Sequence, residues 1–226
     1  MNDIKKAGSV TGRALVLAEE LPLINAQSLR ELSEEEVFAF RVCAADDRVD
    51  RDFERFPPET LRGLAPLFVG RTMIMDHVWS AAGQTARIYA ADVEQGADGI
   101  SRLILRAYML RLPATESAIA AIEGGILREV SVGCAISKAV CSVCGADKRV
   151  TWCEHRPGAE YDGKTCHVDL CGAEDAYEVS FVAVPAQRAA GVVKQYGGED
   201  KQPQEPPEGE KDPSAKALAL LELEII

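Results

Sequence analysis

The chain has 226 residues, of which 47% are hydrophobic, enough for one well-packed domain with appendages. Its formal net charge of -11 gives a surface that repels phosphate backbones, so nucleic acid is not an expected partner. The sequence has no apolar run near the ~20 residues that cross a bilayer, and the opening MNDIKKAGSV has no apolar core of a secretory signal. We therefore expect no membrane partner and a place in the cytoplasm of the cell that makes the protein.

The chain divides by composition into an N-terminal segment, a core and a tail. Residues 1–35 are mixed and end in an acidic stretch that predicts a short helix or linker. From Val37, alternating and β-branched runs predict about six strands, at 37–45, 71–77, 84–94, 100–110, 126–137 and 176–186. Helices are expected at 61–68 and 113–125. These elements predict a mainly β, α+β fold over residues 36–195, with an antiparallel barrel-like core and flanking helices.

The last thirty residues, 196–226, differ from the core. The stretch 197–213 is rich in Pro, Gly, Glu and Lys and cannot bury a core, so it predicts a disordered linker. The final SAKALALLELEII predicts a short amphipathic helix or a docking strand. Such a tether would suit a segment that is held by a partner or removed later, although a frayed terminus explains it equally well.

Cysteine clustering gives the first chemical signal. Six of the seven cysteines lie between Cys134 and Cys171, and a cytosolic chain would keep them reduced. Clustered reduced cysteines indicate metal ligands before disulfides.

The segment CSVCGADKRVTWCEH has the spacing of a zinc site. It places Cys141 and Cys144 in a C-x2-C knuckle and returns with Cys153 and His155. Zinc prefers four such ligands in a tetrahedron, and four protein ligands leave no open position for a catalytic water. We therefore predict a structural Zn2+ site within an insertion at 136–175, whose polar, loop-like sequence needs the folding energy of a metal. Three further residues could replace a ligand: Cys166, His167 and Cys171.

A histidine and a serine in the core are candidates for catalysis. His77 ends a predicted strand, although a lone histidine is more often structural than catalytic. Ser131 lies in REVSVGCA, where it should face away from the neighbouring valines, and the following Gly133 leaves room for a substrate carbonyl. The segment EVSV at 129–132 recurs as EVSF at 178–181, so composition alone does not decide between Ser131 and Ser180.

Four segments together resemble the tailed-phage prohead (capsid) maturation proteases, a serine protease family of the herpesvirus assemblin-like superfamily. They are VDRDFERF at 49–56, MIMDH at 73–77, GILREVSVG at 125–133 and YEVSFVAVPAQRAAGV at 177–192. The resemblance extends over about residues 36–193, and the order of histidine, serine and a later polar residue also agrees with the family.

The resemblance implies roles for three residues. Ser131 matches the nucleophile and His77 the general base, while Glu178 is the expected third residue that orients the imidazole. A histidine fills the third position in assemblin-like relatives, so His155 and His167 remain weaker alternatives. Asp76 should point away from the imidazole on a strand, and no oxyanion donor can be assigned beyond the surroundings of Gly133.

The resemblance also implies a biological setting. Such an enzyme cleaves the scaffolding protein and the major capsid protein inside the assembled prohead in the host bacterium, processes itself, and forms homo-oligomers. The alternative is a catalytically inactive, zinc-binding structural or scaffold component of the phage head. A zinc-dependent hydrolase is a weak third hypothesis, because the predicted ligands close the metal site.

Overall fold

The computed structural model describes residues 19–187 and 189–195. The predicted linker and helix at 196–226, and most of the N-terminal segment, lie outside these residues. None of the helices in the described part has the length and apolar character that crossing a bilayer requires.

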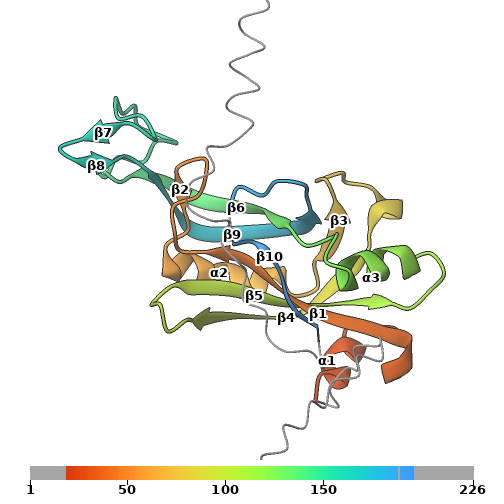
Figure 1. Cartoon of the computed structure of the whole chain (residues 1–226). Helices are drawn as coiled ribbons and strands as arrows, with labels where there is room; N and C mark the ends of the chain where they lie inside the picture. The colour runs from red at the N-terminus through yellow and green to blue at the C-terminus, as the bar shows by residue number, and fades with distance from the viewer. Residues whose placement is uncertain (1–18, 188, 196–226) are drawn as a thin grey trace, which may run out of the picture.

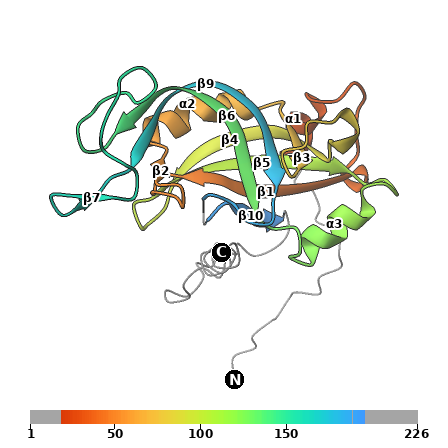
Figure 2. The ribbon, with the colours of Figure 1, turned by 90° about the horizontal axis from the view of Figure 1, so that it is seen from above.

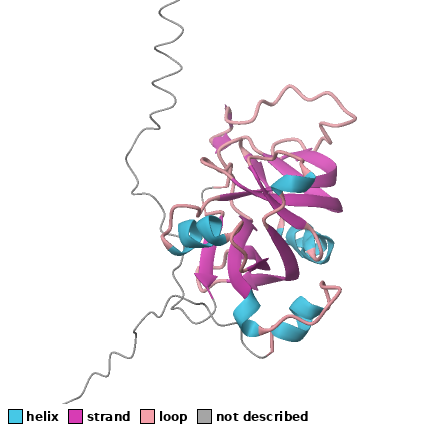
Figure 3. Cartoon of the chain, turned by 90° about the vertical axis from the view of Figure 1, so that its right-hand side faces the viewer, coloured by secondary structure: helices cyan, strands magenta, loops and turns pink. Residues whose placement is uncertain are grey.

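The described residues form a mainly β fold with a few short helices, as the sequence predicts (Figures 1 and 3). The helical segments are α1 (Leu21–Asn25), η1 (Glu34–Glu36), α2 (Pro58–Phe68), η2 (Ala81–Gly83) and α3 (Glu116–Glu123). The strands are β1 (Val37–Asp46), β2 (Glu54–Arg55), β3 (Thr72–Met75), β4 (Ala86–Gln95), β5 (Ser101–Leu110), β6 (Val130–Cys141), β7 (Glu160–Tyr161), β8 (Lys164–Thr165), β9 (Val168–Phe181) and β10 (Gly191–Gln195).

The main sheet is strongly curved, but the predicted barrel is not closed. Its strands follow the order β10-β1-β5-β4-β3-β9-β2, and β6 pairs with β9 beside this path. Within the described residues, the chain at β6 meets β10 through one isolated bridge, Glu129 to Gly191, and not through a continuous ladder. The sheet is also mixed, because β3 and β2 each run parallel to β9.

Helix α2 occupies the concave side of this curved sheet. It packs against β9 on one side and against β4 and β5 on the other (Figure 1). Leu61, Leu64, Ala65 and Phe68 are buried at the i, i+3, i+4, i+7 spacing of an amphipathic helix. They join the inward-facing residues of β1, β5 and β9 in one core cluster. This core fixes β9, the strand that carries the candidate active site, from one face.

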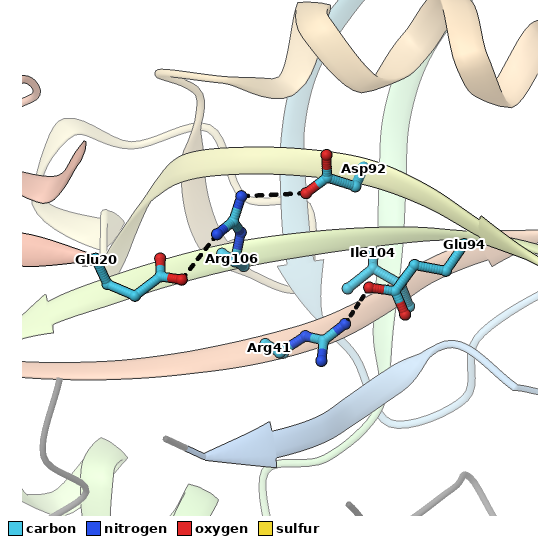
Figure 4. A pocket seen from close by; sticks show the side chains of 6 residues that line it. All are labelled: Glu20, Arg41, Asp92, Glu94, Ile104 and Arg106. Carbon is cyan, nitrogen blue, oxygen red and sulfur yellow. Dashed lines mark hydrogen bonds and ion pairs between the residues drawn. The ribbon is translucent and has the colours of Figure 1, made fainter. Parts of the chain in front are cut away.

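Ion pairs attach the segment before α1 to the outer side of the sheet. They line a small, charged pocket over β1, β4 and β5 (Figure 4). Arg106 lies 2.8 Å from Glu20 and 3.1 Å from Asp92, while Arg41 pairs with Glu94. The pocket thus holds three carboxylates and two guanidinium groups, and the ion pair between Glu20 and Arg106 joins the residue before α1 to the sheet.

The longest ladder in the fold joins β6 and β9, and it leads away from the core to the β7–β8 hairpin (Figures 1 and 2). Its register runs from Val130 opposite Phe181 to Cys141 opposite Val168. The insertion at 136–175, which was predicted to be loop-like, therefore begins in β6 and ends in β9, because the pairing of these strands continues into its polar sequence. At about 3.3 Å per residue, Ser131 and Cys141 lie roughly 30 Å apart along β6.

Candidate active site and metal site

His77 is held at the end of β3 by an unusual turn. Asp76 and His77 both have positive φ, 50° and 55°, and the N–H of Val78 donates to the carbonyl of Met75 at 2.9 Å. Two successive left-handed residues are typical of a type I′ turn, and such a conformation in non-glycine residues is often found at functional sites. The strand predicted to include Asp76 therefore ends earlier, and Asp76 is exposed.

The turn brings the imidazole of His77 against Glu178. His77 Nδ1 lies 2.7 Å from Glu178 Oε1, and the side chain of Glu178 is 4% exposed while that of His77 is 42% exposed. Because an ionised carboxylate only accepts hydrogen bonds, Nδ1 is the donor in this pair, and in the neutral ring this tautomer leaves a lone pair on Nε2. This is the arrangement that a general base requires: an oriented ring with a free nitrogen at the surface.

Ser180 fixes both partners of this pair. It is fully buried, its Oγ donates to Glu178 Oε2 at 2.6 Å, and it accepts the backbone N–H of His77 at 2.9 Å. Its hydroxyl is therefore engaged and shielded from substrate. Of the two serines in the repeated sequence, Ser180 has the character of a positioning residue and Ser131 is the better candidate for a nucleophile.

Ser131 lies on the same face of the sheet as these groups. It is the direct partner of Ser180 in the antiparallel ladder, and paired residues point to the same side with their Cβ atoms about 5 Å apart. Val130, next in the chain, is buried in the core on the opposite face, as predicted. Among the described residues no hydrogen bond joins Ser131 to His77, and such contacts are often long in enzymes without substrate.

Gly133 makes room for the carboxylate of Glu178. The two residues are partners in the β6–β9 ladder, and a Cβ at position 133 would lie 2.4 Å from Glu178 Oε1. The sequence suggested that Gly133 leaves space for a substrate carbonyl. The structure shows that the space is taken by the side chain that holds His77.

We expect Gly133→Ala to displace this carboxylate and to break the bond between Glu178 and His77. Overpacking of this kind costs about 1–3 kcal/mol of stability. Thermal unfolding and the NMR shift of the His77 Nδ1 proton measure the two effects. Gly125→Ala is the matched control for NMR: its Cβ would meet nothing within 4 Å, and its φ of 72° makes alanine strained, so it lowers stability without touching Glu178. A Gly133→Ala protein with an unchanged His77 signal would contradict this role for the glycine.

Cys134 does not compete with Ser131 as a nucleophile. Burial, and secondly the charge of Glu178, raise the pKa of the Cys134 thiol to about 11. The thiol is therefore neutral near pH 7, and a neutral thiol is a poor nucleophile.

The four predicted metal ligands come together at the far end of β6. One atom from each of Cys141, Cys144, Cys153 and His155 lies within 4.8 Å of the others. The Sγ atoms of Cys144 and Cys153 are 3.4 Å apart, and Cys153 Sγ is 3.3 Å from His155 Nδ1. Zinc–sulfur bonds of about 2.3 Å in a tetrahedron place sulfurs roughly 3.8 Å apart, so this donor set fits a tetrahedral metal ion.

The knuckle itself favours a thiolate at Cys141. Burial alone raises the pKa of this thiol, but the backbone N–H groups of Cys144 and Val143, with neighbouring thiols, outweigh burial and lower the pKa to about 6. Metals bind the thiolate form, so this geometry suits a ligand. His155 is braced edge-on by the ring of Tyr161, with centroids 4.6 Å apart.

The three spare candidates lie outside the four-residue cluster. Cys166 is buried with its Sγ 3.9 Å from that of Cys141. The Nε2 of His167 lies 3.4 Å from Asp169 instead. Cys171 lies further along β9, opposite Lys138.

The sequence did not predict three features of the active-site region. They are the hydrogen bonds of Ser180, the fit of Glu178 against Gly133, and the aromatic pair Trp79–Tyr177 next to Glu178. The EVSV–EVSF repeat was the one sequence signal for the first, since it made Ser180 a candidate beside Ser131. Comparison of the chain with models of protein families, with curated proteins and with solved structures finds no match.

Proposed function

We propose that the chain is a serine endopeptidase in which Ser131 is the nucleophile, His77 the general base and Glu178 the residue that orients His77. The observation that carries the proposal is the 2.7 Å bond between His77 Nδ1 and the buried carboxylate of Glu178. A carboxylate buried against an otherwise exposed imidazole orients the ring and stabilises its protonated form during acyl transfer.

The chemistry follows from these positions. Nε2 of His77 takes the Ser131 hydroxyl proton while Oγ attacks the peptide carbonyl carbon, and the imidazolium then protonates the leaving amine. A water molecule, deprotonated by the same nitrogen, attacks the acyl-enzyme and releases the acid with Ser131 restored. Glu178 accepts the hydrogen bond from Nδ1 throughout, and Ser180 holds its carboxylate in place.

The metal site has a structural role in this proposal, and zinc is the metal that its donors suit best. Three thiolates and one imidazole are typical of structural zinc, with no ligand position left for water. A separation of roughly 30 Å along β6 keeps the ion away from the scissile bond. Bound zinc would stabilise the distal part of the β6–β9 ladder, and therefore the register that sets Ser131 opposite Ser180.

The proposed substrates are the scaffolding protein and the major capsid protein of a tailed phage, cleaved during head maturation. This part rests on the resemblance of 49–56, 73–77, 125–133 and 177–192 to the prohead proteases. Ser131, His77 and Glu178 lie in three of these segments. Glu178 is hydrogen-bonded to His77, and Ser131 pairs with Ser180, which hydrogen-bonds both of them. Self-cleavage would occur in the Pro- and Glu-rich stretch 197–213.

Mass spectrometry of the chain co-expressed with its scaffolding and capsid proteins tests this function. We expect defined fragments of both proteins, and a shortened chain, with the unaltered protease and none with Ser131→Ala. Intact partner proteins in both cases would support the alternative, a catalytically inactive component that holds a metal in the head.

A further inference from the structure

A pocket beside the candidate active site combines exposed aromatic surface with Glu178. It encloses about 500 Å³ between the β3 side of the sheet and the loop after β3. Trp79 and Tyr177 form its aromatic wall, with ring centroids 5.8 Å apart, and their exposed fractions are 72% and 41%. A tryptophan this exposed contributes little to the core, so its apolar surface is available to a ligand.

A bulge in the β6–β9 ladder creates this wall. Gly133 pairs with Glu178 and Cys134 with Ala176, so Tyr177 is an extra residue on β9. Tyr177 and Glu178 then line the same pocket although they are consecutive. Bulges often redirect a side chain next to an active site in this way.

The two arginines that line the pocket already form hydrogen bonds within the protein. Arg71 pairs with Asp175 at 2.8 Å, and Arg87 donates to the carbonyl of Gly70 at 2.8 Å and to Gln84 at 3.1 Å. An anionic ligand would have to compete with these bonds. Unused binding capacity therefore lies in the aromatic rings, which favour an apolar or aromatic group.

The pocket is also at a defined distance from Ser131. Tyr177, in the aromatic wall, lies three residues before Ser180 on β9, and Ser180 pairs with Ser131 on the neighbouring strand. One strand spacing and three residues correspond to roughly 11 Å. An extended peptide covers this distance in about three or four residues.

We propose that this pocket, with Trp79 and Tyr177 as its wall, binds an apolar or aromatic side chain of the peptide substrate three or four residues from the scissile bond. This inference rests on the proposed peptidase function. The two aromatic residues act as specificity determinants, because they contact the substrate away from the reacting atoms.

Peptide kinetics test the position and the chemistry of this subsite. Fluorogenic peptides carry Phe, Leu, Asp or Lys at each of the four positions on either side of the cut. We expect Phe or Leu at the third or fourth position to raise kcat/KM by roughly tenfold over Asp. Trp79→Ala and Tyr177→Ala should remove this preference mainly through KM. Trp152→Ala, which removes a similarly exposed tryptophan of the metal-binding insertion, should keep it. An unchanged preference in both pocket variants would overturn the proposal.

A binding measurement separates failure of the pocket from failure of the peptidase. In a Ser131→Ala, Trp152→Phe protein, Trp79 is the sole tryptophan and no hydrolysis is needed. N-acetyl-phenylalanine amide should change its fluorescence in a saturable way, N-acetyl-aspartate amide should not, and Tyr177→Ala should weaken the binding severalfold. No saturable change would overturn the pocket even if peptides are cleaved. Saturable binding without any cleavage by the unaltered chain would support the pocket and refute the peptidase.

Discussion

Replacing Ser131 with alanine is expected to abolish peptide hydrolysis while leaving the fold intact. Loss of a serine nucleophile lowers kcat by about 10⁶-fold in well-studied serine proteases, so the residual rate should approach background. The fold should persist because the removed hydroxyl makes no hydrogen bond to the imidazole among the described residues. Steady-state cleavage of a peptide substrate, with circular dichroism and thermal unfolding, measures both parts.

Ser137→Ala is the matched control for this experiment. Ser137 lies on the same strand, and its Oγ donates to the carbonyl of Cys171 at 3.1 Å, far from His77. We expect it to retain activity within about twofold, as surface substitutions away from a site generally do. If Ser131→Ala kept more than a small fraction of the activity, Ser131 would not be the nucleophile.

Removing the metal is expected to lower stability and activity together. A ligand at a thousand times its Kd stabilises the folded state by about 4 kcal/mol, which for a domain of this size corresponds to roughly 10 °C in melting temperature. Chelation, or Cys153→Ser, should lower the melting temperature by about this amount, since the distal β6–β9 ladder loses its support. Differential scanning calorimetry and elemental analysis of the same samples measure the change.

Cys171→Ser serves as the control, because this cysteine lies outside the four-residue cluster. It should keep one metal ion per chain and an unchanged response to chelator. A chelated protein that loses all hydrolysis at once, with its melting temperature unchanged, would contradict a structural role and favour metal catalysis. If elemental analysis found no zinc in protein purified without chelator, the metal would have no part in the proposed function.

Local pattern predicted many of the elements but not all, since β2, β7, β8 and β10 were not among the predicted strands. Alternation and β-branched residues identified β1, β4 and β5, and helical spacing identified α2 and α3. Long-range pairing could not be predicted in the same way. The parallel register of β3 on β9 and the incomplete closure between β6 and β10 depend on contacts between distant strands, which no local period encodes.

The two candidate sites show the same contrast between local sequence pattern and long-range contacts. The convergence of Cys141, Cys144, Cys153 and His155 was predictable because they lie within one short segment with zinc-like spacing. The closeness of His77 and Glu178 came from the resemblance, since 101 positions separate them in the chain. Composition did not separate Ser180 from Ser131, the resemblance favoured Ser131, and burial and hydrogen bonding distinguish the two in the structure.

Labelling with a fluorophosphonate tests the central claim most directly, because it needs no knowledge of the substrate. The reagent phosphonylates a serine hydroxyl activated by a neighbouring base. We predict one adduct per chain, located on Ser131 by peptide mass spectrometry, absent from Ser131→Ala and strongly reduced in His77→Ala. A folded chain that stays unlabelled, or an adduct that persists in Ser131→Ala, would contradict the assignment of Ser131 and His77 as a catalytic pair.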